Sequence, residues 1–137
     1  MLPTLQTNPT RLFDTTVFID HLRQKNKPAE QLIIEGISGE FPAAFSILTD
    51  AELWSGVRTQ EEHRKHRILL SRFQRLPFTL TIARRVGVIR RIYKEKGHTV
   101  LIPDGIIAAT AEHYNLPLYT RNVTHFKFID SIVVFGY

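Results

Sequence analysis

The segment "RLFDTTVFIDHLRQ" (residues 11–24) joins a predicted strand to a predicted helix, with an acid at the junction. "RLF" is typical of the end of a short strand. After it, Phe18, Ile19 and Leu22 are spaced as on one face of a helix. Asp14 falls between the two elements, at the carboxyl end of the strand. The fold class then depends on whether such units recur along the chain.

The rest of the sequence alternates in the same way between short apolar runs and longer amphipathic stretches. It predicts strands over 43–48, 78–80, 117–120 and 131–135, and helices over 28–37, 49–57, 61–76, 82–97 and 103–115. Alternation of this kind is typical of an α/β domain with a mostly parallel central sheet and helices on both sides. We expect one domain over 1–137, with residues 1–10 as a loose arm.

Composition narrows the function further. The chain has 137 residues, 43% of them hydrophobic and 23% charged, and no cysteine, which excludes disulfides and thiol chemistry. We find no apolar run of membrane-spanning length and no apolar signal core at the start, so we expect a cytoplasmic protein without a membrane partner. The net charge of +5 favours polyanionic partners, although the basic runs 63–67 and 84–96 also suit solvated helix faces.

Three acids occupy equivalent positions in three separate segments. Asp14 follows the first strand, and Glu52 and Asp104 each lie in the first turn of a predicted helix. In parallel sheets, functional groups gather beyond the carboxyl ends of the strands. Each acid alone has a simpler interpretation: Asp14 as a helix cap, Glu52 as the partner of Thr49 in a capping box, and Asp104 as a complement to the helix dipole. The shared placement of all three favours a common site.

Converging carboxylates repel one another, so they need protons or a cation. We therefore expect at least one of the three to have a raised pKa in the absence of metal. Oxygen ligands suit Mg²⁺ or Mn²⁺, and such an ion can support phosphodiester cleavage. Acids flanked by basic helices thus predict a metal-dependent nuclease.

Three blocks of sequence carry a family resemblance. They are "LFDTTVFIDHLR" (12–23), "SILTDAELWSGV" (46–57) and "IPDGIIAATAEHYNLPLYTRNVTHF" (102–126). In this order and spacing they resemble the PIN-domain ribonucleases of the VapC toxin type, and the resemblance extends over residues 11–135.

The resemblance implies a three-layer α/β/α fold with a central, mostly parallel sheet. It also implies Mg²⁺- or Mn²⁺-dependent cleavage of single-stranded RNA, usually by a homodimer, with Asp14, Glu52 and Asp104 as the catalytic and metal-binding acids. Toxins of this type belong to type II toxin–antitoxin pairs, and the tail of a cognate antitoxin covers their active-site groove.

Four further residues are secondary candidates. Asn122 and His125 stand where many family members carry acids, and we expect His125 at the rim of the site because its surroundings are polar. Thr15 is expected to cap its helix or to hold Asp14 by a hydrogen bond. Arg121 suits contact with a phosphate or with solvent.

The missing acid at His125 leaves room for a second hypothesis, a catalytically weak module that binds RNA or a protein partner. A third hypothesis, a metal-dependent phosphatase for a small molecule, is disfavoured because no segment resembles a glycine-rich phosphate loop.

Overall fold

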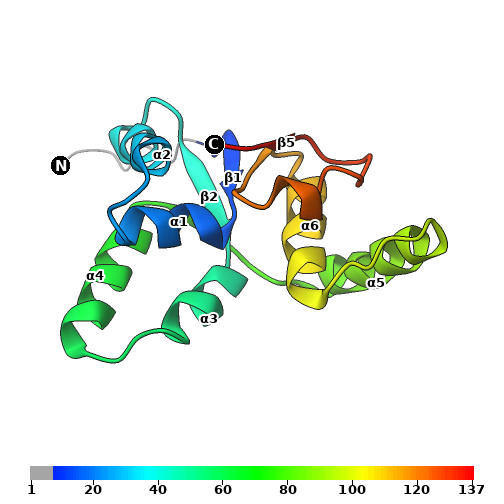
Figure 1. Ribbon diagram of the computed structural model, residues 1–137, viewed down its shortest axis with the longest axis horizontal. Coiled ribbons are helices and arrows are strands. Elements are labelled where there is room, and N and C mark those ends of the chain that lie inside the picture. The colour runs from blue at the N-terminus through cyan, green and yellow to red at the C-terminus, as the bar shows by residue number, and fades with distance from the viewer. Residues whose placement is uncertain (1–7) are drawn as a thin grey trace.

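The computed structural model describes residues 8–137 and contains five strands and six α-helices in that range. The strands are β1 (Arg11–Phe13), β2 (Ala43–Ser46), β3 (Gln74–Leu76), β4 (Leu118–Tyr119) and β5 (Val134–Phe135). The helices are α1 (Thr15–Leu22), α2 (Lys27–Ser38), α3 (Leu48–Trp54), α4 (Gln60–Leu70), α5 (Leu80–Glu95) and α6 (Ile102–Tyr114). Figure 1 shows their arrangement along the chain.

The strands form one sheet in the order β3-β2-β1-β4-β5, and every pairing in it is parallel. β1 lies in the centre, where Phe13 pairs with Phe45 of β2 on one side and with Tyr119 of β4 on the other. The chain winds outward from β1 in both directions, so β1 and β4 flank the point where the strand order reverses. Ligands of open α/β sheets bind at this point, beyond the carboxyl ends of the strands.

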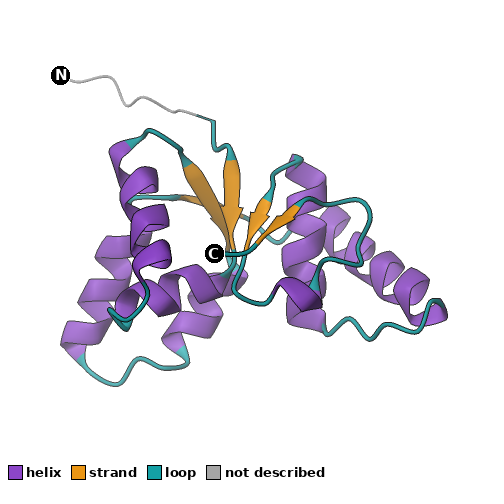
Figure 2. Cartoon of the chain, turned by 45° about the horizontal axis from the view of Figure 1, so that its top comes forward, coloured by secondary structure: helices purple, strands orange, loops and turns teal. Residues whose placement is uncertain are grey.

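Helices cover both faces of the sheet, which gives the three layers predicted from the sequence (Figure 2). Successive residues of a strand point to opposite faces. Phe13 and Phe45 accordingly join one core with Phe18, Ile33 and Leu70, which come from α1, α2 and α4. This first core is rich in aromatic contacts; for example, the rings of Phe18 and Phe45 meet edge to face at 5.6 Å.

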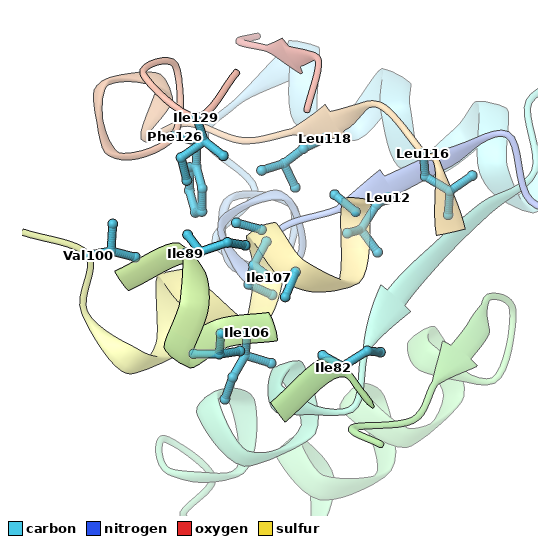
Figure 3. Packing of buried hydrophobic residues seen from close by; sticks show 14 of the residues in the cluster. Leu12, Ile82, Ile89, Val100, Ile106, Ile107, Leu116, Leu118, Phe126 and Ile129 are labelled. Atoms are coloured by element: carbon cyan, nitrogen blue, oxygen red, sulfur yellow. The ribbon is translucent and has the colours of Figure 1, made fainter. Parts of the chain in front are cut away.

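The other face of the sheet carries a second core, shown in Figure 3. Leu12 and Leu118 of the sheet meet Ile89 of α5 and Ile107 of α6 there. The close approach of α5 and α6 depends on Gly105, since a Cβ at that position would stand 2.8 Å from Cγ1 of Val86. Helix α6 carries Asp104, so this packing also positions a candidate site residue.

The predicted helix over 61–76 is wrong in its second half. Helix α4 ends at Leu70, and residues 74–76 instead form β3, which pairs with β2 at the edge of the sheet. The strand predicted at 78–80 is absent, because residues 77–79 form the connection to α5. An amphipathic pattern favours a helix locally, but pairing with a neighbouring strand overrides that preference.

Other boundaries differ by a few residues. β2 ends at Ser46, whose side-chain oxygen accepts a hydrogen bond from the backbone N–H of Leu48 at 3.1 Å, and the chain turns into α3. β5 covers only Val134–Phe135 of the strand predicted over 131–135.

The predicted loose arm at 1–10 falls mostly on residues 1–7, which lie outside the described residues. Within residues 8–10, Thr10 is attached to the domain: its backbone N–H and its hydroxyl both donate to the carbonyl oxygen of Pro42, at 2.8 and 3.1 Å. Within residues 8–137, every helix is too short or too polar to cross a membrane.

Candidate active site

The three predicted acids gather at one edge of the sheet. Asp14 directly follows β1, at the point where the strand order reverses. Glu52 comes from α3, the helix after β2, and Asp104 from the first turn of α6. Helix α3 contacts both α1 and α6, and this contact brings the three segments together (Figure 1).

Asp14 is held by hydroxyl groups. Its side chain is only 6% exposed, and its Oδ2 accepts hydrogen bonds from Thr16 at 3.0 Å and from Thr120 at 2.8 Å. Its backbone N–H donates to Tyr119 of β4 at 2.9 Å. Oδ1 has no hydrogen-bond partner within residues 8–137. The carboxylate is therefore fixed through one oxygen, and the other is available to a ligand.

Glu52 is held from α1, and the predicted capping box with Thr49 is wrong. Helix α3 begins at Leu48, and the residue before it makes no side-chain cap. Instead, the hydroxyl of Thr15 donates to Oε1 of Glu52 at 2.8 Å and lies 2.8 Å from the hydroxyl of Thr49. Because Thr15 has one proton to give, Thr49 must be the donor in their shared bond. The prediction that Thr15 caps its helix or holds Asp14 is therefore wrong.

Asp104 lies beside His125. The Nδ1 atom of His125 is 3.2 Å from Oδ2 of Asp104, and the two side chains are 51% and 27% exposed. His125 therefore sits at the solvent-facing rim, as predicted, but its ring also contacts a site acid, which the sequence did not indicate. Backbone placement explains the contact: His125 ends a short 3₁₀ turn (Val123–His125) that brings it over the start of α6.

The pKa values of two of the acids are raised. Partial burial is the main cause of the raised pKa of Glu52; the hydrogen bond from Thr15 opposes it, and the charges of Asp14 and Asp104 add to it. Burial is also the main cause of the raised pKa of Asp104, with His125 opposing and Asp14 adding. The direction agrees with the sequence-based expectation, and like charges contribute, but burial has the larger effect.

Asp20 of α1 stabilises the wall of the site. Asp20 is 6% exposed; its carboxylate binds the Arg121 guanidinium and accepts a hydrogen bond from the Tyr137 hydroxyl at 2.8 Å. The backbone N–H of Arg121 donates to the hydroxyl of Thr16 at 3.1 Å, and Thr16 in turn donates to Asp14. The Arg121 side chain thus anchors the chain after β4 to α1.

Asn122 contributes through its backbone. Its N–H donates to the hydroxyl of Thr120 at 3.0 Å and its carbonyl accepts from the N–H of His125 at 3.0 Å, while its side chain makes no hydrogen bond within residues 8–137. The amide oxygen of Asn122, at the position where many family members carry an acid, thus has no hydrogen-bond partner within residues 8–137.

Sequence reasoning missed Thr16, Thr120 and Tyr137. Thr120 could have been found, because it follows β4 at the same edge of the sheet as Asp14 and the rule that selected Asp14 applies to it equally. Thr16 could be separated from Thr15 only by knowing where the first helical turn points each side chain. The role of Tyr137 depends on a contact with Asp20 that spans 117 positions.

The donors at this edge are carboxylate, hydroxyl and amide oxygens, the types that Mg²⁺ and Mn²⁺ prefer. Within residues 8–137, no three acid or histidine side chains converge closely enough to bind an ion by themselves. Mg²⁺ commonly uses one or two carboxylates and retains several waters, so the donor set fits an ion bound partly through water.

Comparisons with known proteins agree with this geometry. The PIN domain family model matches residues 11–129. The chain is 37% identical over 121 residues to Ribonuclease VapC10 of Mycobacterium tuberculosis, covering 88% of this chain and 89% of the relative. It is 31% identical over 140 residues to Toxin FitB of Neisseria gonorrhoeae, covering 91% and 96%.

Among solved structures, a toxin-antitoxin complex from Klebsiella pneumoniae superimposes with a TM-score of 0.72 at 32% identity, covering 90% of this chain and 95% of the other. VapBC2 from Rickettsia felis, bound to a DNA fragment from the promoter, gives a TM-score of 0.80 at 21% identity, covering 93% and 98%, and shows the shared fold. The chain belongs to the PIN-domain family, and within it to the VapC type.

Proposed function

We propose that this protein is a Mg²⁺- or Mn²⁺-dependent endoribonuclease that cleaves single-stranded RNA, and that it is the toxin of a type II toxin–antitoxin pair. One observation carries the proposal: Asp14, Glu52 and Asp104 lie at the edge where the strand order reverses, and no arginine or lysine neutralises them in the described residues. The similarity to Ribonuclease VapC10 supports the reaction and the class of substrate.

The residues would divide the work as follows. Asp14, oriented by Thr16 and Thr120, presents its unpartnered oxygen, and Glu52 and Asp104 provide further oxygen ligands from the neighbouring helices. A bound Mg²⁺ or Mn²⁺ would activate water and offset the charge that develops on the cleaved phosphodiester. The raised pKa values of Glu52 and Asp104 show that their charged forms are unfavourable without a cation, as expected for metal ligands in the absence of the metal.

The test is cleavage of single-stranded RNA with Mg²⁺ or Mn²⁺ by the wild type and by Asp14→Asn, Glu52→Gln and Asp104→Asn. Asp50→Asn is the matched control, because Asp50 lies in the same helix as Glu52 but pairs with Arg75 at 2.8 Å. We expect the three site variants to lose at least 100-fold in rate, on the order of one general acid–base or metal contribution, and the control to stay active. Equal cleavage by all variants would show that the activity comes from a contaminant.

Partners follow from the same relatives. The similar structure from Klebsiella pneumoniae is a toxin-antitoxin complex. The one from Rickettsia felis is VapBC2 bound to a DNA fragment from the promoter. We infer that this chain also has a cognate antitoxin, that it forms a homodimer and that it acts in the cytoplasm. Sedimentation of the purified chain tests the dimer, and co-expression with candidate small DNA-binding proteins from neighbouring genes tests the antitoxin by rescue of cell growth.

A catalytically weak binding module is the second candidate, and the contact between His125 and Asp104 favours it. The imidazole occupies a place beside the site acid without adding a negative charge. Calorimetric titration with Mn²⁺ separates the candidates: a weak module should bind poorly and gain affinity in His125→Asp. A competent enzyme should bind Mn²⁺ without that change and lose the binding in Asp14→Asn.

A further inference from the structure

A basic cavity lies between α5 and the segment that leads into α6. Its volume is about 550 Å³, and its lining includes Gly87, Arg90, Arg91 and Lys94 of α5 and His98 of the following segment. No acid lines it. Arg90 also packs against the start of α6, which carries Asp104: its Cγ is 3.8 Å from the position that a Cβ would take on Gly105.

The cavity walls are fixed by contacts within the domain. Nε of Arg90 donates to the carbonyl oxygen of Val100 at 2.8 Å, and the backbone N–H of His98 donates to the carbonyl oxygen of Tyr93 at 2.8 Å. The His98 ring stacks on Phe128 with centroids 4.1 Å apart and planes 3° from parallel. The terminal nitrogens of Arg90 make no hydrogen bond within residues 8–137, so they are available to a ligand. The cavity is also formed before the ligand binds.

The positive charge of the cavity is not compensated. Arg90, Arg91 and Lys94 form no ion pair with a carboxylate in the part of the chain that the structure describes, although Glu95 is a neighbour on the same helix. Lys94 alone could be explained by the helix dipole, because it lies in the last turn of α5. Arg90 and Arg91 lie a turn earlier, where that effect has faded.

Gly87 lines the same cavity and offers a way to test it. It lies on an exposed part of α5, and a Cβ there would meet nothing within 4 Å. Glycine in the interior of a helix destabilises it relative to alanine, and neither packing nor backbone conformation requires glycine at this position. Alanine would leave the cavity open, whereas a larger side chain at this lining position would reach into it.

We propose that this cavity binds a backbone phosphate of the RNA substrate, farther along the strand from the phosphate that is cleaved. The inference rests on the proposed function, since it adds a subsite for the same strand. Guanidinium groups match phosphate oxygens in pairs, and a single strand that crosses the start of α6 from the three acids reaches Arg90 first and then Arg91 and Lys94. Binding at this subsite is independent of the sequence of the RNA, because it reads only the backbone.

The first experiment measures binding without cleavage. A fluorescently labelled, unstructured RNA is titrated in EDTA over a range of KCl concentrations, with the wild type, Arg91→Gln/Lys94→Gln and the control Lys65→Gln/Arg67→Gln. Lys65 and Arg67 are exposed on α4, so the control loses the same charge elsewhere. The pocket variant should flatten the plot of log affinity against log salt by about 1.4 and lose about 10- to 30-fold in affinity at 0.1 M salt. Equal losses in the control would overturn the proposal.

A second variant blocks the cavity without changing its charge. Gly87→Leu should fold well, because leucine is the better helix former, and should weaken RNA binding as the charge variant does. Gly87→Ala, which leaves the cavity open, should bind as the wild type. Normal binding by Gly87→Leu would contradict the subsite. The proposal would also fail if Gly87→Leu lost binding to a polyglutamate peptide but kept RNA binding, since the cavity would then serve a protein partner.

Kinetics separate this inference from the proposed function. Arg91→Gln/Lys94→Gln should raise KM and leave kcat near the wild-type value, while Asp14→Asn should lose cleavage but keep the binding that depends on the cavity. An unchanged KM in the double variant, with cleavage still abolished by Asp14→Asn, would remove the subsite and leave the proposed function intact.

Discussion

At the scale of single residues, the choice of partner separates structural acids from site acids. The carboxylates of Asp20, Glu35, Asp50 and Glu112 each bind an arginine. Asp14 and Glu52 are held by threonine hydroxyls instead. A hydroxyl orients a carboxylate without neutralising it, so the negative charge stays available for a cation.

Replacing Thr120 should separate orientation from charge. Thr120→Val keeps the shape of a fully buried side chain but removes the donor to Asp14 and the acceptor for the N–H of Asn122. We expect the free energy of unfolding to fall by about 1–3 kcal/mol, because the buried carboxylate of Asp14 loses a donor and the partly buried N–H of Asn122 loses its acceptor. Mn²⁺ affinity, measured by calorimetry on the folded variant, should fall as well. Unchanged Mn²⁺ binding would show that Thr120 serves stability alone.

The ion pair between Arg85 and Glu112 should appear in the pH dependence of stability. Burial alone would raise the pKa of Glu112, but hydrogen bonds from Arg85 and Ser131 outweigh it and leave the pKa lowered. A lowered pKa means that the pair stabilises the fold above the ordinary glutamate pKa, and that this stability is lost as the pH falls through the folded value.

Glu112→Gln should therefore be less stable than the wild type by about 0.5–1 kcal/mol at neutral pH, a small value because Arg85 is 41% exposed and solvent screens the pair. Urea unfolding at several pH values measures the difference, which should shrink once the pH is well below about 4.3, the ordinary glutamate pKa. A difference that stays constant with pH would contradict the role given to the ion pair.

The candidate site was predictable from the sequence to the extent that it depends on position in an element. Asp14 follows β1 and Asp104 lies in the first turn of α6, at element ends that share one edge of a parallel sheet, and that rule needs no coordinates. Glu52 was expected in the first turn of its helix, but α3 begins at Leu48, so its first-turn acid is Asp50 and Glu52 lies in the next turn. The contacts of Thr16 and His125 were not predictable, because they depend on how individual side chains turn and on the path of an irregular segment.

At the scale of elements, the contact between α5 and α6 positions Asp104. Gly105→Ala would place a Cβ 2.8 Å from the buried side chain of Val86, which is stiff because it is β-branched. We expect a loss of about 1–3 kcal/mol in the free energy of unfolding, as for other overpacked cores.

Gly87→Ala is the matched control for this substitution, since a Cβ there meets nothing within 4 Å. It should stabilise the protein by about 0.5–1 kcal/mol, the usual gain from replacing a helical glycine. Thermal unfolding of both variants measures the contrast, and equal shifts in the same direction would show that close approach at Gly105 is not what matters.

β3 shows why the fold was only partly predictable at this scale. Residues 74–76 continue an amphipathic pattern that began in α4, and nothing local ends it before Pro77. Their identity as a strand comes from pairing with Ala44–Ser46. The long helices were predicted well because each buries its own apolar stripe, whereas a three-residue edge strand is defined by its neighbour.

At the scale of the whole molecule, the acids couple the site to global stability. Without metal, the raised pKa of Glu52 means that its charged form opposes folding at neutral pH. Glu52→Gln should therefore unfold at a higher temperature than the wild type in EDTA. The carboxamide can still accept the hydrogen bond from Thr15. A lower unfolding temperature in EDTA would contradict the raised pKa of Glu52.

Saturating Mn²⁺ should instead make the wild type more stable than Glu52→Gln. A ligand at 100 times its dissociation constant adds about 2.7 kcal/mol to the stability of the state that binds it. The wild type and Asp50→Asn should gain this stability in differential scanning fluorimetry, and Asp14→Asn should not. A gain shared by all three proteins would place the Mn²⁺ site elsewhere.

The hydrogen bond between Asp14 and Thr120 joins residues that are 106 positions apart. Ribosomes add about 5–20 residues per second, so Asp14 leaves the peptidyl-transferase centre about 5–20 s before its second hydroxyl donor is made. The central strand β1 waits equally long for β4. In a nascent chain, Asp14 and β1 therefore stay without their partners from the β4 region until nearly the whole domain has been made.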